Sequence, residues 1–162
     1  MSRTLAITFA IGLAVMAAVV GGVLVVQHGA HIELIGKILK VRTAPLDENS
    51  SVVVIDYRVQ NPADYTFMAQ AVTVILEDAK GVRTEGKTAS ERDATQLFLN
   101  VPLLGEKFNS SLKIRDQVPA RSTADHMTAA RFEVPETQLQ TRKRFLIKIE
   151  DVDGPVAEFS EK

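Results

Sequence analysis

The candidates for nucleophilic catalysis in this sequence are one histidine and the serines near it in the chain. His126 is the only histidine after residue 31, so a Ser–His–Asp site would use it as the base. The nucleophile would then be one of three serines: Ser110, Ser111 or Ser122. Asp125 precedes His126 directly, and on a strand their side chains point to opposite faces, so Asp125 would not orient the imidazole. His126 instead shares its strand parity with three residues that suit a core: Thr128, Ala130 and Phe132. This parity favours a histidine at the margin of a core, and we expect no catalytic residue; a hydrolase that uses His126 is the enzyme alternative.

Carboxylates gather before a glycine near the C-terminus. Glu150, Asp151 and Asp153 precede Gly154, and oxygen ligands beside a tight glycine turn suit a hard cation such as calcium. Their spacing is not that of an EF-hand, so we expect a solvated turn, no metal and no cofactor. The chain has no cysteine, which excludes disulfides, thiolate metal sites and cysteine nucleophiles. Sequence motifs for nucleotide phosphates, zinc proteases and serine hydrolases are also absent.

The charge balance argues against a nucleic-acid partner. The 162 residues suit one domain and an appendage, and 19 basic residues against 20 acidic ones give a formal net charge of −1. A nucleic-acid-binding protein normally carries a clear basic excess. The basic run at 141–144 has no interleaved aromatic residue, so we interpret it as the solvated entry to a strand.

An uncharged apolar segment near the N-terminus predicts a transmembrane helix. No Asp, Glu, Lys or Arg lies between Arg3 and Glu33, and residues 5–26 contain Thr8 as their only hydroxyl. A helix of that length spans about 33 Å, enough to cross a bilayer core. The run is longer than the core of a typical secretory signal, although a cleaved signal is the alternative. We therefore expect a tail with a membrane helix at 1–30 and a folded domain at 31–162.

The flanking charges bear on orientation. Arg3 precedes the apolar run, and three further basic residues follow it: Lys37, Lys40 and Arg42. The latter three alternate with apolar residues, as expected of a folded strand rather than a free flank. We therefore predict a single-pass membrane protein with a cytoplasmic N-terminus and a periplasmic or extracellular C-terminal domain.

Small residues recur at every fourth position of the apolar run: Ala6, Ala10, Ala14, Ala18 and Gly22. Such a stripe lets a second helix backbone approach closely within a membrane. The alternative is that composition alone places them in register. The stripe predicts association with a protein partner, or with a second copy of the chain, through the membrane helix.

After residue 31 the hydrophobic pattern changes to the period of two that is typical of strands. Eight short segments show it: 32–43, 53–59, 72–76, 82–84, 108–114, 128–134, 145–149 and 155–159. Turn signals separate them, among them Asn61-Pro62, because proline cannot donate to a strand ladder. Many short alternating strands in about 130 residues predict an all-β fold, an antiparallel β-sandwich of about seven strands.

One segment departs from the strand pattern. Ser90 suits the N-cap of a helix, and Asp93 follows three residues later. Pro102 prevents a long continuation. We predict a short helix or turn at residues 90–98, with a loop as the alternative.

The strand sequences themselves resemble known families. Val53, Ile55, Tyr57 and Val59 run into Asn61-Pro62, and residues 72–78 follow with a Lys80-Gly81 turn. This stretch resembles late embryogenesis abundant type-two domains and bacterial FxLYD-like modules. The runs at 132–135 and 145–151 resemble uncharacterised bacterial proteins with one N-terminal membrane segment. The resemblance covers residues 40–150 and implies an immunoglobulin-like sandwich of seven strands, with no catalytic residue to transfer.

These observations predict a single-pass protein that displays an immunoglobulin-like domain for protein contacts, either alone or as an accessory subunit of a membrane assembly. The alternative is a module that binds a small molecule or an envelope glycan. Such a module would need an exposed aromatic platform, and the same residues are the candidates for contact with a partner: Tyr57, Tyr65, Phe67 and Phe98.

Overall fold

The computed structural model describes residues 12–22 and 34–161, and the chain divides into two units, Met1–His31 and Ile32–Lys162. In the first unit, residues 12–22 are helical, with large apolar side chains that are more than half exposed: Leu13, Val15, Met16, Val19 and Val20. Among the described residues no helix is long and apolar enough to cross a membrane. The predicted span at 5–26 extends beyond the described helix at both ends. Of the predicted stripe, Ala6 and Ala10 lie outside the described residues.

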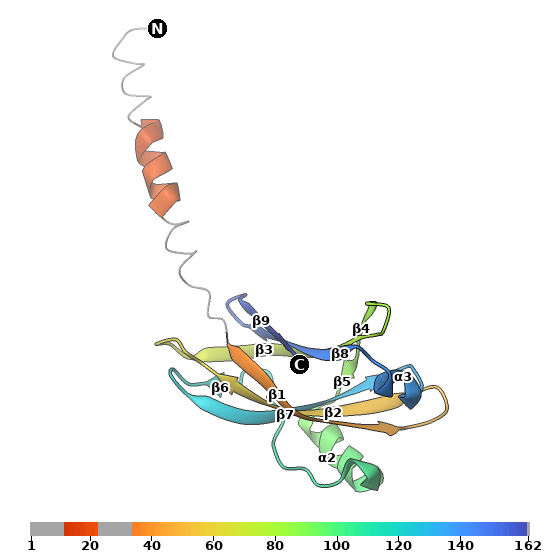
Figure 1. Ribbon diagram of the computed structural model, residues 1–162. Helices are drawn as coiled ribbons and strands as arrows, with labels where there is room; N and C mark the ends of the chain where they lie inside the picture. The colour runs from red at the N-terminus through yellow and green to blue at the C-terminus, as the bar shows by residue number, and fades with distance from the viewer. Residues whose placement is uncertain (1–11, 23–33, 162) are drawn as a thin grey trace. The chain divides into compact units, whose positions relative to one another are not determined.

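The second unit is a β-sandwich of two sheets (Figure 1). The first sheet has the order β1-β2-β7-β5, formed by Ile35–Pro45, Ser51–Gln60, Thr123–Phe132 and Lys87–Thr88. The second has the order β4-β3-β8-β9, formed by Arg83–Glu85, Phe67–Glu77, Arg144–Asp151 and Val156–Ser160, with β6 (Gln117–Val118) also paired to β3. Every pairing between these strands is antiparallel. The all-β sandwich is confirmed, with nine strands in place of about seven.

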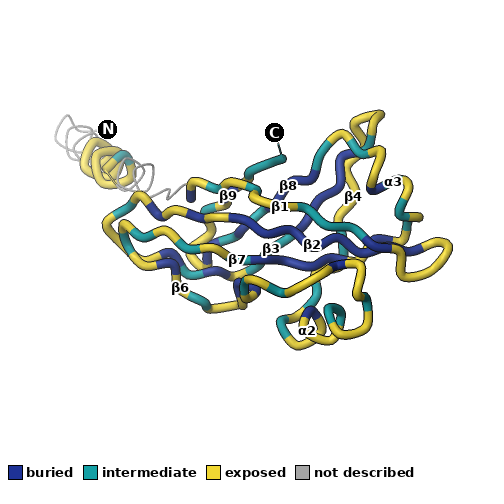
Figure 2. Tube along the Cα trace, turned by 60° about the horizontal axis from the view of Figure 1, so that its bottom comes forward, coloured by how far each residue is buried: buried dark blue, intermediate teal, exposed yellow. Residues whose placement is uncertain are grey.

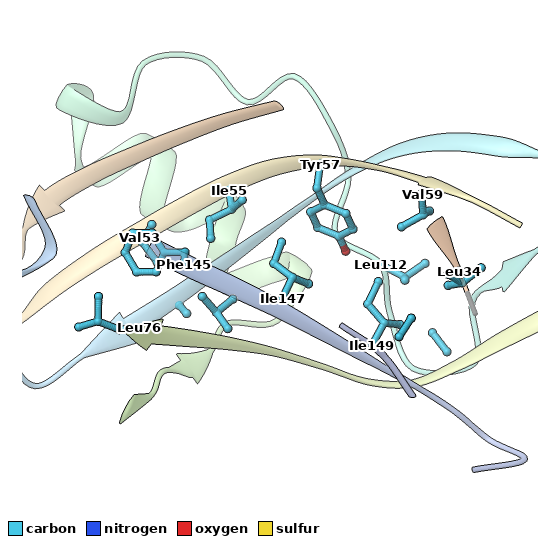
Figure 3. Close-up of a cluster of buried hydrophobic side chains, with 14 of the residues drawn as sticks. Leu34, Val53, Ile55, Tyr57, Val59, Leu76, Leu112, Phe145, Ile147 and Ile149 are labelled. Atoms are coloured by element: carbon cyan, nitrogen blue, oxygen red, sulfur yellow. The ribbon is translucent and has the colours of Figure 1, made fainter. Parts of the chain in front are cut away.

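The main core lies between the two sheets (Figure 3). Strand β2 contributes every second residue, and β8 faces it with the same alternation: Val53, Ile55, Tyr57 and Val59 opposite Phe145, Ile147 and Ile149. Phe132 of β7 packs on Phe145 with ring centroids 6.1 Å apart. The alternation in the sequence therefore identified the inward face of these strands correctly.

A second, smaller core covers the outer face of the first sheet. Helix α2 (Glu91–Asn100) and the 3-10 turn η1 (Pro102–Leu104) pack there against apolar residues of the sheet: Ala44, Val52, Val54, Met127 and Ala129. Strand β2 is thus buried on both faces for most of its length, as the dark tube in Figure 2 shows. The predicted helix start is confirmed, since the Asp93 amide donates to Ser90 Oγ at 3.2 Å.

The prediction of a strand at 108–114 is wrong. Phe108 and Ile114 are largely exposed, and the segment makes only one isolated bridge, a parallel one between Ser111 and Met127. Arg115 adopts a positive φ of 69°, a conformation that ends an extended segment. A second difference is α3 (Glu136–Gln140), a short helix after Pro135 that the strand pattern did not predict.

Candidate functional site

The four predicted aromatic contact residues do not form one exposed platform. Tyr57 and Phe67 are fully buried in the main core, so their assignment as contact residues is wrong. Phe98 packs beside Arg42, with the guanidinium carbon 5.0 Å from the centroid of the Phe98 ring. Tyr65 is 48% exposed on the loop after β2. The alternation places Tyr57 on the same inward face of its strand as Val53, Ile55 and Val59, which is incompatible with a role as an exposed contact residue.

His126 lies at the margin of the main core, opposite Tyr57 on the neighbouring strand. Their ring centroids are 6.2 Å apart, and His126 Nδ1 is buried without a hydrogen-bond partner. Burial lowers the pKa of His126, while the negative charges of Asp116 and Asp125 act in the opposite direction. Burial also raises the pKa of the Tyr57 phenol.

Two of the remaining candidates for a Ser–His–Asp site, Asp125 and Ser122, are engaged elsewhere. Asp125 binds Arg58 through two hydrogen bonds of 2.6 and 2.8 Å. The Ser122 hydroxyl donates to the Pro119 carbonyl oxygen at 2.7 Å. Within the described residues no hydrogen bond joins a serine hydroxyl to His126.

Two of the carboxylates at the acidic turn near the C-terminus are bound by neighbouring groups of the protein. The Asp153 amide donates to Asp151 Oδ1 at 3.1 Å, and Glu150 pairs with Lys148 at 2.7 Å. In the described part of the chain no group of three acidic, histidine or cysteine side chains is placed to hold a metal ion.

The structure contains a groove of about 610 Å³ at the edge of β3, which we call the β3 groove. Three segments that are distant in sequence line it: residues 69–72 of β3, residues 88–92 at the start of α2, and residues 111–114. Much of the lining is apolar and comes from small or branched side chains: Ala69, Ala71, Val72, Ala89, Leu112 and Ile114. Sequence analysis missed this site, because small apolar residues in strands carry no functional signal.

The β3 groove forms where β3 lacks a continuous neighbour strand. Strand β6 pairs with Phe67 and Met68, and β4 pairs with residues 75–77, which leaves the middle of this edge without a strand. The segment at 86–88 approaches Val72, where the Thr88 hydroxyl donates to the Val72 carbonyl oxygen at 3.0 Å. On the other side, the Arg115 amide donates to the Ala69 carbonyl oxygen at 2.7 Å. The groove lies between these two hydrogen bonds to the β3 edge.

Of the charged groups at the β3 groove, the carboxylate is paired within the protein and the two cations are not paired within the described residues. Glu91 forms an ion pair with Lys107 and accepts a hydrogen bond of 2.7 Å from the Ser111 amide. Arg92 and Lys113 are exposed, and neither takes part in an ion pair within the described residues. Ser111 Oγ is buried without a hydrogen-bond partner. The groove thus combines an apolar lining with two unpaired cations and one unsatisfied hydroxyl.

Comparisons with known proteins add little to this description. No protein-family model and no curated protein matches the chain. An uncharacterised β-sandwich protein from Clostridium difficile 630 is 10% identical over 80% of this chain and 86% of its own, with a TM-score of 0.40. The putative ApaA protein from Bordetella pertussis is 10% identical over 82% and 90%, with a TM-score of 0.38. The Iho670 flagellar-like filament is 12% identical over 99% and 98%, with a TM-score of 0.35. At such scores none of the three assigns a function. Within the described residues, the chain is a β-sandwich protein with an apolar groove at a sheet edge.

Proposed function

We propose that this chain is a membrane-anchored binding protein whose β-sandwich holds an apolar ligand in the β3 groove. The groove itself carries the proposal. Its volume of about 610 Å³ falls within the range of small-molecule sites, and its apolar lining with a few polar groups is typical of them. The burial of Tyr57 and Phe67 argues against the alternative of a glycan platform.

An immunoglobulin-like topology for the sandwich is part of this proposal. The order β1-β2-β7-β5 faces the order β4-β3-β8-β9. If the strands other than the two-residue β6 are lettered along the chain, this arrangement corresponds to A-B-E-D packed on C′-C-F-G, the order of immunoglobulin-like domains. Such domains serve many functions, so the groove rather than the fold supports the binding role.

The anchor is the second part of the proposal. The uncharged run at 5–26 and the exposed apolar side chains of the helix at 12–22 support insertion into a bilayer, with the domain outside the cytoplasm. Ala14 and Ala18 lie on this helix and support a contact with a protein partner or a second copy. Replacement of Ala14 by Leu should weaken that association about 5- to 30-fold, while Val15→Leu should not. Equal behaviour of the two variants in a membrane association assay would mean that the stripe is only composition.

The absence of cysteine offers a direct test of the groove. A single cysteine in place of Ile114, which is 73% exposed at the rim, can carry an environment-sensitive fluorophore in the full-length protein. Titration with octanol, a neutral apolar probe, should shift its emission and saturate. A label at Val82, an exposed position outside the groove lining, should not respond.

A groove-filling substitution completes the test. Ala71→Leu should raise the dissociation constant for octanol, because the larger side chain occupies part of the groove. Thr84→Leu on β4 also adds bulk but lies outside the lining, so it should leave binding unchanged. A saturable signal that Ala71→Leu leaves unaltered would contradict the assignment of the site.

A further inference from the structure

We infer that the β3 groove is selective for a single-chain amphiphile with an anionic headgroup, of which a medium-chain carboxylate is the simplest example. The inference rests on the proposed binding function and adds the class of ligand. It follows from two unpaired cations, a buried hydroxyl and a helix N-terminus placed together at one apolar groove.

The apolar part of the ligand is indicated by the lining. Ala69 and Leu112 are almost fully buried, and Leu112 also belongs to the main core, where Figure 3 shows it beside Leu34 and Val59. Ile114 extends the apolar surface outward at the rim. A hydrocarbon chain in this groove would remove both its own surface and that of the lining from water.

The charge of the preferred ligand follows from which charged side chains of the groove are already paired within the protein. Glu91, the one carboxylate in the lining, is occupied by Lys107 and by the Ser111 amide. Arg92 and Lys113 have no such partner in the described residues. The positive charge that remains at the groove is complementary to an anion and not to a cation.

Two further groups suit an anionic headgroup in particular. The first turn of α2 lies at the groove, and the N-terminus of a ten-residue helix carries partial positive charge. Ser111, which also lines the groove, has a hydroxyl that is buried without a partner. Buried polar groups are normally satisfied. This hydroxyl also lies near the Glu91 carboxylate and helps to lower the pKa of Glu91, so a headgroup oxygen would compete with Glu91 for its hydrogen.

The β3 edge itself argues against an extended peptide as the ligand. A peptide that joins a sheet needs a run of free backbone groups on the edge strand. Here β3 has a bulge between Ala69 and Ala71, the Val72 oxygen accepts from Thr88, and both backbone groups of Ala69 are bonded to residues 115 and 116. The groove therefore suits a compact amphiphile better than an added strand.

The experiment compares octanoate with octanol in the full-length protein labelled at Ile114→Cys. Octanoate is the less hydrophobic of the two, so tighter binding of octanoate requires recognition of its charge. We expect octanoate to bind roughly tenfold more tightly than octanol, as charge-assisted hydrogen bonds allow. Arg92→Gln and Lys113→Gln should each weaken octanoate binding several-fold more than they weaken octanol binding.

Lys87→Gln provides the matched control, because Lys87 is an exposed lysine on β5 that does not line the groove. It should change neither affinity. Octanoate binding no tighter than octanol, or equal losses for both ligands in Lys113→Gln, would overturn the inference and leave the binding function standing. Failure of octanol as well as octanoate to bind would overturn the proposed function itself.

Discussion

Arg42 should be the most costly charged residue to replace, because it joins the first sheet to the segment that follows α2. Its Nη2 atom lies 2.7 Å from Asp56 Oδ2, and its Nη1 atom donates to the carbonyl oxygens of Leu104 and Glu106, each at 2.7 Å. The side chains of Arg42 and Asp56 are only 10% and 5% exposed. The guanidinium also lies 5.7 Å from the centroid of the Phe108 ring.

The expected magnitude follows from this burial. Removing one partner of a buried ion pair leaves an uncompensated charge and costs about 3–5 kcal/mol. We predict that Arg42→Met lowers the free energy of unfolding by about 3 kcal/mol, the lower end of that range, because the Asn109 amide still donates to Asp56 Oδ1 at 3.0 Å. In an Asp56→Asn background the same replacement should cost less, because no charge is left unpaired.

Arg58 offers a matched control on the next strand. It also binds a carboxylate through two hydrogen bonds, but its side chain and that of Asp125 are 52% and 35% exposed. Arg58→Met should therefore cost less than about 1 kcal/mol. Urea unfolding followed by far-UV circular dichroism measures both, since the chain has no Trp for fluorescence. Equal losses for the two variants would refute the argument from burial.

Three further predictions concern other parts of the sandwich. Hydrogen bonds from Lys143 and then Arg144 hold the pKa of Glu77 at about 2, below its ordinary 4.5, although burial opposes the shift. The contribution of ionised Glu77 to the stability of the fold is therefore complete above pH 4.5 and is lost as the pH falls towards 2. Glu77→Gln should reduce the change of Tm with pH between pH 4.5 and 2. Asn61→Ala should cost about 3 kcal/mol in urea unfolding, because the buried amide makes three hydrogen bonds to backbone groups. Gly36→Ala should lower stability by about 1–3 kcal/mol in the same assay, because a Cβ there would overlap the Phe159 ring.

Local patterns predicted much of the sandwich. The alternation at 53–59 and 145–149 identifies residues that do face each other across the main core. Asn61 and Pro62 end β2 as expected, and Ser90 caps α2. Each of these features depends on neighbours within a few residues, which is the range over which a single sequence carries a strong signal.

Features that depend on distant parts of the chain could not be predicted in the same way. Val54 and Asp56 alternate with the residues of the main core and so occupy the other face of β2, yet α2 and the segment after it bury both. The alternation at 108–114 resembles a strand, but Glu91 binds the Ser111 amide, and the pairing of this segment with β7 is limited to the isolated bridge between Ser111 and Met127. Which face is covered, and by what, is settled by tertiary packing.

The β3 groove shows how one local signal has a consequence far from its position in the sequence. The cap at Ser90 fixes where α2 begins, and the first residue of that helix is Glu91. Through Lys107 and the Ser111 amide, Glu91 holds the 107–111 segment against the helix start. That attachment places Leu112 in the main core and leaves Lys113 exposed at the groove. For the binding function that we propose, Glu91 is therefore a positioning residue, because its own charge is paired within the fold while Arg92 and Lys113 remain unpaired among the described residues.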